Sequence, residues 1–177
     1  AARVAERLGL RMVASGVIGE AGGVEHDGHG LLMAHESSWV NPNRNDLSRD
    51  IIEERLLSAY GADRMIWAPG VKGRDITDYH IDALARFVKP GVVLIQLPEK
   101  VIAGDPFSKA AWETYEILKR ATDAQGRKFE IVVIDEPVDV RSPREDFVAS
   151  YVNYYVCNGA VIAAEFGDDR ADEAARK

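Results

Sequence analysis

Hydrophobic residues in this chain fall into short runs that alternate between the spacing of helices and the spacing of strands. Two stretches, residues 48–60 and 105–121, place apolar side chains three or four positions apart, as an amphipathic helix does. Shorter apolar and β-branched runs predict strands at residues 11–18, 31–35, 64–67, 81–88, 92–97, 129–134, 151–156 and 160–166. Short helices are predicted at residues 4–8 and from residue 168 onward. The pattern predicts an α/β (α+β) fold in which strand hairpins alternate with helices.

Capping and turn residues set the expected ends of these elements. Ser48 is suited to begin the first long helix as its N-cap, and Gly61 is suited to end it. Hairpin turns are expected at residues 89–91 and 158–159, where proline, asparagine and glycine favour tight turns.

The order of the predicted elements suggests a repeat. Helix-plus-hairpin segments follow each other at residues 48–97 and 105–166, which indicates a repeated αβ unit. No change in composition marks a linker between them. We therefore expect residues 1–177 to belong to a single domain.

Net charge narrows the class of partner. The chain of 177 residues is 46% hydrophobic and carries a formal net charge of −7, with a pI of about 5.1. Nucleic-acid binding generally needs a basic surface to meet the phosphates, so no nucleic-acid partner is expected. An acidic balance is compatible with a small cationic substrate.

Cysteine content and the chain start bear on location. Cys157 is the single cysteine, which excludes an internal disulfide and a four-cysteine zinc site and suits a reducing cytoplasm. No apolar run approaches the roughly 20 residues that span a bilayer, so no membrane partner is expected. The chain starts at Ala1 without an initiator methionine or a signal peptide, and we expect it to begin inside a longer gene product.

Polar residues gather in the turn-rich segments. His80 and Asp82 are two positions apart, and in a strand that spacing places both side chains on one face, about 7 Å apart. Such a pair is also typical of the solvated face of a strand. Glu20 lies in a glycine-rich turn, where a surface acid is the plain interpretation. Residues 41–45 form a loop in which Arg44 is expected to brace its neighbours by hydrogen bonds.

A histidine-rich segment raises the alternative of a metal site. His26, His29 and His35 are closely spaced, and tight histidine spacing is a metal-ligand signal. Gly28 and Gly30 instead indicate a hairpin turn. We interpret the segment as a turn and assign no metal.

A set of ordered motifs resembles the agmatine deiminases and the wider bacterial peptidylarginine deiminase-type family. The motifs are EAGGV at 20–24, HDGHG at 26–30, NPNRN at 41–45, TDYHID at 77–82, ATDAQGRK at 121–128, SYVNYY at 150–155 and FGD at 166–168. Each motif alone is weak. Their order over nearly the whole chain carries the resemblance.

This resemblance implies a fold and a reaction. The family fold is a pseudo-fivefold α/β propeller of the pentein type, of which this partial deiminase domain would supply some blades and lack the N-terminal and C-terminal ones. The implied reaction converts agmatine and water to N-carbamoylputrescine and ammonia, a step toward putrescine, through a cysteine-bound intermediate. The resemblance implies no cofactor and no metal, a small cationic guanidine substrate, and leaves a homo-oligomer of the full-length protein open.

Roles for the polar residues follow from the same resemblance. Asp82 becomes a carboxylate that binds the guanidinium, and His80 becomes the general acid and base. Glu20 contacts the guanidinium or the histidine. The sequence departs from the family pattern at Ala21 and Tyr79, where glycine is usual, and a tyrosine does not easily adopt a positive φ; Tyr79 could also crowd the site.

The nucleophile is expected outside this chain. Cys157 follows Val156 on a predicted apolar strand, where a buried thiol is unreactive, and the family nucleophile lies nearer the C-terminus. We therefore expect the chain alone to be inactive. The alternatives are a peptidylarginine deiminase and an inactive family member that only binds guanidines.

Overall fold

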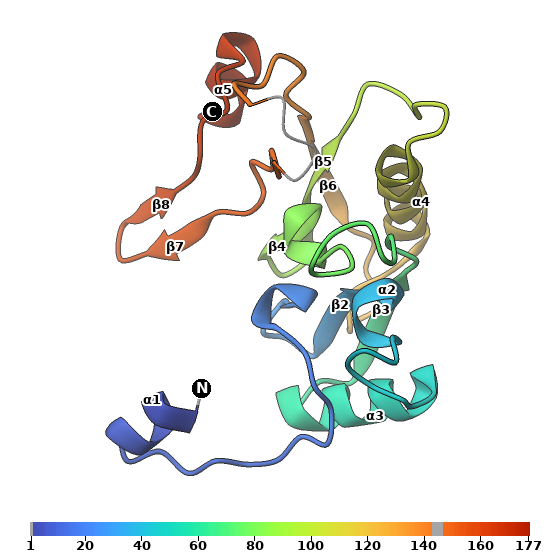
Figure 1. Ribbon diagram of the computed structural model, residues 1–177, viewed down its shortest axis with the longest axis vertical. Coiled ribbons are helices and arrows are strands. Elements are labelled where there is room, and N and C mark those ends of the chain that lie inside the picture. The colour runs from blue at the N-terminus through green and yellow to red at the C-terminus, as the bar shows by residue number, and fades with distance from the viewer. Residues whose placement is uncertain (1, 143–146) are drawn as a thin grey trace.

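The computed structural model describes residues 2–142 and 147–177. They form a mixed α/β structure of short sheets and helices (Figure 1). Two copies of one unit follow each other, each made of an antiparallel hairpin, a helix and a third strand that pairs in parallel with the second. The copies comprise β1 (Val24–His26), β2 (Leu31–His35), α3 (Arg49–Tyr60) and β3 (Arg64–Ala68), and then β4 (Ala85–Lys89), β5 (Val92–Leu97), α4 (Pro106–Arg120) and β6 (Glu130–Asp135).

A third hairpin repeats the start of this unit. It consists of β7 (Tyr155–Cys157) and β8 (Ala160–Ile162) and is followed by α5 (Asp169–Ala175). The remaining elements are α1 (Ala2–Arg7), α2 (Glu36–Trp39) and two 3₁₀ turns, η1 (Ala21–Gly23) and η2 (Ile81–Ala83). In Figure 1, α1 and the β7–β8 hairpin stand apart from the two larger sheets. Among the described residues, no helix has the length and apolar character needed to cross a bilayer.

The repeat expected from the sequence is present but begins at a different point. Each unit starts with its hairpin and places the helix between the second and third strands, whereas the sequence suggested a helix followed by a hairpin. Parallel strands cannot be joined by a tight turn and need a long crossover, which contains α3 in the first unit and α4 in the second. The parallel pairing therefore sets the order within the unit.

Local signals explain where the long helices begin and end. Ser48 Oγ accepts a hydrogen bond from Ile51 N at the start of α3, and Gly61 ends that helix in the left-handed conformation at φ +64°. The carboxylate of Asp105 accepts from two backbone N–H groups at the start of α4. Both helix predictions are confirmed.

The core joins the two larger sheets. Leu31 and Met33 of β2 contribute to a cluster shared with the second sheet and α4, while Leu32 and Ala34 contribute to a second cluster under α3. Both faces of β2 are therefore buried. This explains why the strand reads as a continuous apolar run rather than as an alternating one.

One predicted strand is wrong and another begins later than expected. Residues 11–18 form no strand, and Met12 and Val13 are exposed, because no described strand pairs with that segment. The strand predicted at residues 81–88 starts only at Ala85, since the residues of η2 form a 3₁₀ turn.

The last hairpin differs from its prediction in length and in burial, because β7 begins only at Tyr155 and β8 ends already at Ile162. The turn at residues 158–159 is confirmed, but Val156, Val161 and Ile162 are exposed. Cys157 is half-buried at the end of β7. The interpretation that this cysteine lies on a core-facing strand is wrong, because β7 and β8 pair only with each other in the described chain.

Candidate active site

Glu20 and His80 occupy equivalent positions in the two repeated units. Glu20 is the residue before η1, which leads into β1, and His80 is the residue before η2, which leads into β4. Both residues have extended backbone conformations. Because the two turns contact each other, side chains far apart in sequence meet there.

The structure brings Glu20, His80 and Asp82 together. Nε2 of His80 lies 3.1 Å from Oε2 of Glu20. Gly22 lies against both other groups: a Cβ at this position would stand 2.4 Å from Oδ2 of Asp82 and 2.8 Å from Nδ1 of His80. No side chain fits at residue 22 without moving them, so glycine permits the close approach of the two turns.

Arg44 connects Glu20 to the segment that carries His80. Its Nε donates to both carboxylate oxygens of Glu20, at 2.8 and 3.1 Å, and its Nη1 lies 2.7 Å from Oδ2 of Asp78. The side chains of Arg44 and Asp78 are 8% and 6% exposed. The expectation that Arg44 braces neighbouring loops is confirmed, and the loops are those on either side of the site.

These contacts determine the charge state of Glu20. Desolvation acts to raise the pKa of Glu20, but hydrogen bonds from Arg44 and His80 outweigh it and hold the pKa below its ordinary value. An ionised carboxylate only accepts hydrogen bonds, so Nε2 of His80 carries a proton. The other ring nitrogen, Nδ1, is the one near Gly22 and Asp82.

Asp82 has a different environment. Burial raises its pKa, while the positive charges of His80 and Arg86 act to lower it. Within the described residues, no side chain donates a hydrogen bond to the Asp82 carboxylate. A cation with N–H groups placed beside Asp82 would supply the missing donors and favour the ionised form.

Arg86 joins three segments next to Asp82. Its Nε lies 3.0 Å from Oε1 of Glu25 on β1, and its Nη1 donates to the backbone oxygen of Tyr154 at 2.6 Å. The guanidinium also lies over the Tyr154 ring, 4.7 Å from its centroid. Glu25 thereby neutralises the charge of Arg86, and Tyr154 holds its side chain in place. Arg86 was not among the site residues expected from the sequence.

Trp39 and Asn45 hold the loop that carries Glu20. The indole Nε1 donates to the backbone oxygen of Gly23 at 2.6 Å, and a Cβ at Gly19 would lie 2.3 Å from the indole ring. The amide of Asn45 exchanges two hydrogen bonds with the backbone of Ile18, each 2.8 Å long. Glu20 is therefore fixed from both sides.

The backbone just before His80 is strained. Among the described residues, Asp78 at φ +56° and Tyr79 at φ +64° are the non-glycine residues with positive φ. The left-handed conformation costs roughly 1–2 kcal/mol for a residue with a Cβ. Tyr79 thus adopts the positive φ that a tyrosine does not easily reach, whereas Ala21 does not have a positive φ. The Tyr79 ring packs between His35 and Phe107 at the edge of the core.

The histidine-rich segment forms the expected turn. Oδ1 of Asp27 accepts from the backbone N–H groups of His29 and Leu31, and Gly28 and Gly30 have positive φ. His35 is fully buried while His26 is exposed. The described residues contain no group of three or more His, Cys, Asp or Glu side chains suited to a metal.

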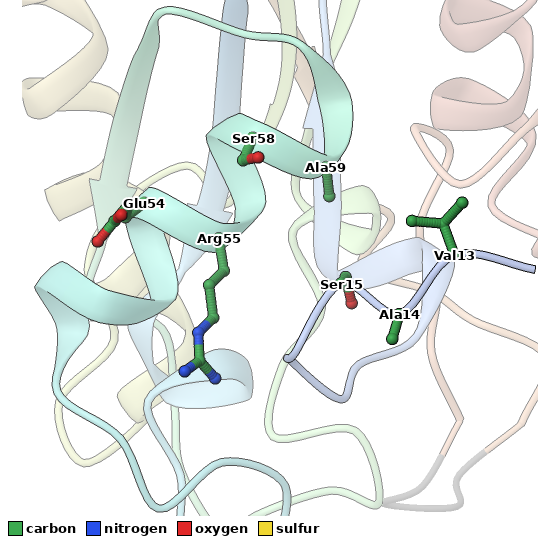
Figure 2. A pocket seen from close by; sticks show the side chains of 7 residues that line it. All are labelled: Val13, Ala14, Ser15, Glu54, Arg55, Ser58 and Ala59. Atoms are coloured by element: carbon green, nitrogen blue, oxygen red, sulfur yellow. The ribbon is translucent and has the colours of Figure 1, made fainter.

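A surface hollow of about 410 Å³ lies between residues 13–15 and helix α3 (Figure 2). Arg55 of α3 donates from Nη1 to the backbone oxygen of Gly16 at 2.5 Å and so ties the N-terminal segment to the helix. The lining residues are Val13, Ala14, Ser15, Glu54, Arg55, Ser58 and Ala59. Glu20, His80 and Asp82 are not among them, so the hollow is separate from the candidate site.

Comparison with known proteins places this geometry in a family. All 177 residues match the family model described as Porphyromonas-type peptidyl-arginine deiminase. The agmatine deiminase of Medicago truncatula is 35% identical to this chain, in a match that covers 88% of this chain and 46% of the relative. The chain thus spans about half the length of the curated relatives it matches.

Solved structures agree with the fold. The agmatine deiminase of Enterococcus faecalis matches with a TM-score of 0.83 at 24% identity, over 98% of this chain and 52% of that one. An agmatine deiminase of C. jejuni, a cysteine-to-serine variant with substrate bound, matches with a TM-score of 0.73 at 26% identity, over 87% and 44% of the two chains. Since the family model matches from the first residue to the last, the chain belongs to the family of Porphyromonas-type peptidyl-arginine deiminases.

Proposed function

We propose that the protein containing this chain is a hydrolase of agmatine, which it converts with water to N-carbamoylputrescine and ammonia. The observation that carries the proposal is the meeting of Glu20, His80 and Asp82 around Gly22, in a chain 35% identical to a plant agmatine deiminase. We further propose that its repeated units are blades of a pseudo-fivefold propeller and that residues 1–177 are one part of that domain.

Asp82 binds the substrate in this proposal. A guanidinium is planar and cationic, with N–H groups that a carboxylate accepts in pairs. The Asp82 carboxylate has no side-chain donor among the described residues, and burial has raised its pKa. A bound guanidinium satisfies the carboxylate and stabilises its charge, so binding the substrate relieves the cost of burying Asp82.

His80 moves the protons. A thiolate from outside this segment attacks the guanidinium carbon, and one C–N bond breaks as His80 gives a proton to the departing nitrogen, which leaves as ammonia. His80 then takes one proton from water as the water oxygen bonds to the same carbon. The C–S bond breaks to return the thiolate, and the oxygen releases its second proton to solvent as the carbonyl forms. Glu20 keeps Nε2 protonated through both steps, which leaves Nδ1 as the nitrogen that gains and loses the proton.

An assay of the full-length protein tests the function. Ammonia release is measured with agmatine, free arginine and a peptidylarginine as separate substrates. Preference for agmatine supports the proposal. Preference for the peptide supports the second candidate, a peptidylarginine deiminase, which the description of the matching family favours. Binding of agmatine without ammonia release from any substrate indicates a guanidine-binding protein and overturns the hydrolase proposal.

A further inference from the structure

The strained pair Asp78 and Tyr79 is held in place by groups outside the catalytic set. The backbone oxygen of Asp78 accepts from Ser37 Oγ at 2.6 Å, and the backbone N–H of Tyr79 donates to Oδ1 of Asp75 at 3.2 Å. The backbone oxygen of Tyr79 lies 2.8 Å from Nδ1 of His35. Since a carbonyl oxygen only accepts, Nδ1 of His35 carries a proton.

His35 also contacts the Tyr79 side chain. The two rings are stacked, with centroids 4.7 Å apart and planes inclined by 29°. The His35 side chain is fully buried, and its Nε2 has no hydrogen-bond partner among the described residues. Burial lowers the pKa of His35 to about 4, so the ring is neutral at neutral pH. Burying the His35 ring with an unpaired nitrogen costs stability. Because its hydrogen bond and its ring stacking are both with Tyr79, the buried ring points to a role at Tyr79.

We infer that His35 is a positioning residue for His80. By its hydrogen bond to the Tyr79 carbonyl and its stacking on the Tyr79 ring, His35 holds the left-handed backbone that aims the next residue, His80, at Glu20. The inference rests on the proposed function. It also accounts for a tyrosine at a position where the family pattern has glycine, because glycine adopts positive φ without such support.

The test combines substitutions at the two residues in the full-length protein. His35→Ala should lower kcat for ammonia release from agmatine by about 10- to 100-fold and change KM little, because a misaimed catalytic group costs turnover rather than binding. His35→Asn keeps an N–H donor near the position of Nδ1 and should retain kcat within about threefold. His29→Ala, which removes an exposed histidine, is the matched control and should leave kcat unchanged.

Tyr79→Gly separates positioning from stability. In that background the backbone needs no support, so adding His35→Ala should change kcat by less than about threefold, although the melting temperature falls in both backgrounds. An equal loss of kcat in the two backgrounds overturns the inference, as does a His35→Asn variant as slow as His35→Ala. If the parent protein releases no ammonia from agmatine, the proposed function fails and crystal structures decide the inference. A His80–Glu20 contact still near 3.1 Å in His35→Ala then overturns it, and a separated pair supports it.

Discussion

Replacing Arg44 by methionine should destabilise the protein far more than the loss of an ordinary surface charge. Methionine keeps much of the length of the arginine side chain and removes the guanidinium. Arg44 and Asp78 are nearly fully buried and joined at 2.7 Å. Removing one partner of such a pair leaves an uncompensated buried charge and costs about 3–5 kcal/mol. Asn43 and the backbone of Gly73 also donate to Asp78, so we expect the lower end of that range.

Arg49 provides the matched control. It pairs with Glu36 at 2.8 Å, but the two side chains are 50% and 40% exposed. An exposed ion pair contributes little to stability, because solvent screens its two charges. Urea denaturation of the full-length protein, followed by circular dichroism, gives the unfolding midpoints. With a slope of about 1–3 kcal/mol per molar urea, Arg44→Met should lower the midpoint by about 1 M or more, and Arg49→Met should hardly move it.

The pH dependence of this effect follows from Asp78. Desolvation acts to raise its pKa, but hydrogen bonds from Asn43, Gly73 and Arg44 hold the pKa below its ordinary value of 3.8. A carboxyl group with a lowered folded-state pKa stabilises the fold above the unfolded-state pKa and loses that contribution as pH falls through the folded value. The gap between parent and Arg44→Met should therefore be constant from about pH 5 to 8 and shrink below about pH 4. Equal midpoints for Arg44→Met and Arg49→Met, or a gap that does not change with acid, would refute the reasoning.

The remaining predictions concern catalysis. In the full-length protein, His80→Ala should lower ammonia release from agmatine by about 10²–10⁴-fold, and near-parental rates would remove His80 from the mechanism. Asp82→Asn should lose most of the activity, because an amide N–H₂ would face the donors of the guanidinium; unchanged kcat/KM would contradict substrate binding by Asp82. Gly22→Ala should lower kcat/KM at least about tenfold, since its methyl group would displace Asp82 and His80, while Ala21→Gly, one residue earlier, serves as the control. The 177-residue chain alone should release no ammonia, because the nucleophilic thiol is expected outside it and Cys157, its only thiol, ends a hairpin that pairs with no other described strand. Turnover that disappears in Cys157→Ser would show that the nucleophile has been misplaced.

The helices and inner strands could be predicted from sequence because their signals are local. The N-cap at Ser48 and the glycine at residue 61 mark α3 without reference to the rest of the chain. The strand expected at residues 11–18 failed because its apolar spacing specifies no pairing partner, and pairing depends on the distant chain. The last hairpin is present, but its burial was wrongly predicted for a related reason, since an apolar run does not reveal what covers it.

The proximity of Glu20, His80 and Asp82 was predicted for reasons that were partly wrong. Spacing in a strand was expected to align His80 with Asp82, but His80 precedes a 3₁₀ turn, Asp82 lies within that turn, and the two side chains meet at Gly22 instead. The contacts of Trp39 and Arg86 bridge segments far apart in sequence. No local pattern specifies such contacts, so neither residue was recognised as part of the support of the site.

The meeting of Glu20 and His80 follows from the phase of the repeat. Once each unit is taken to begin with its hairpin, the two residues fall at the same place, just before the short turn that leads into the first strand. Equivalent positions in adjacent copies of one unit lie side by side, because each copy packs on its neighbour through the same surfaces. The phase suggested by the sequence began the units at residues 48 and 105, which placed Glu20 outside both of them and hid its equivalence to His80. The local feature that permits the contact is the run of small residues at Ala21, Gly22 and Gly23 before β1. Glycine at residue 22 lets the two turns approach closely, because a Cβ there would collide with Asp82 and His80 of the facing segment.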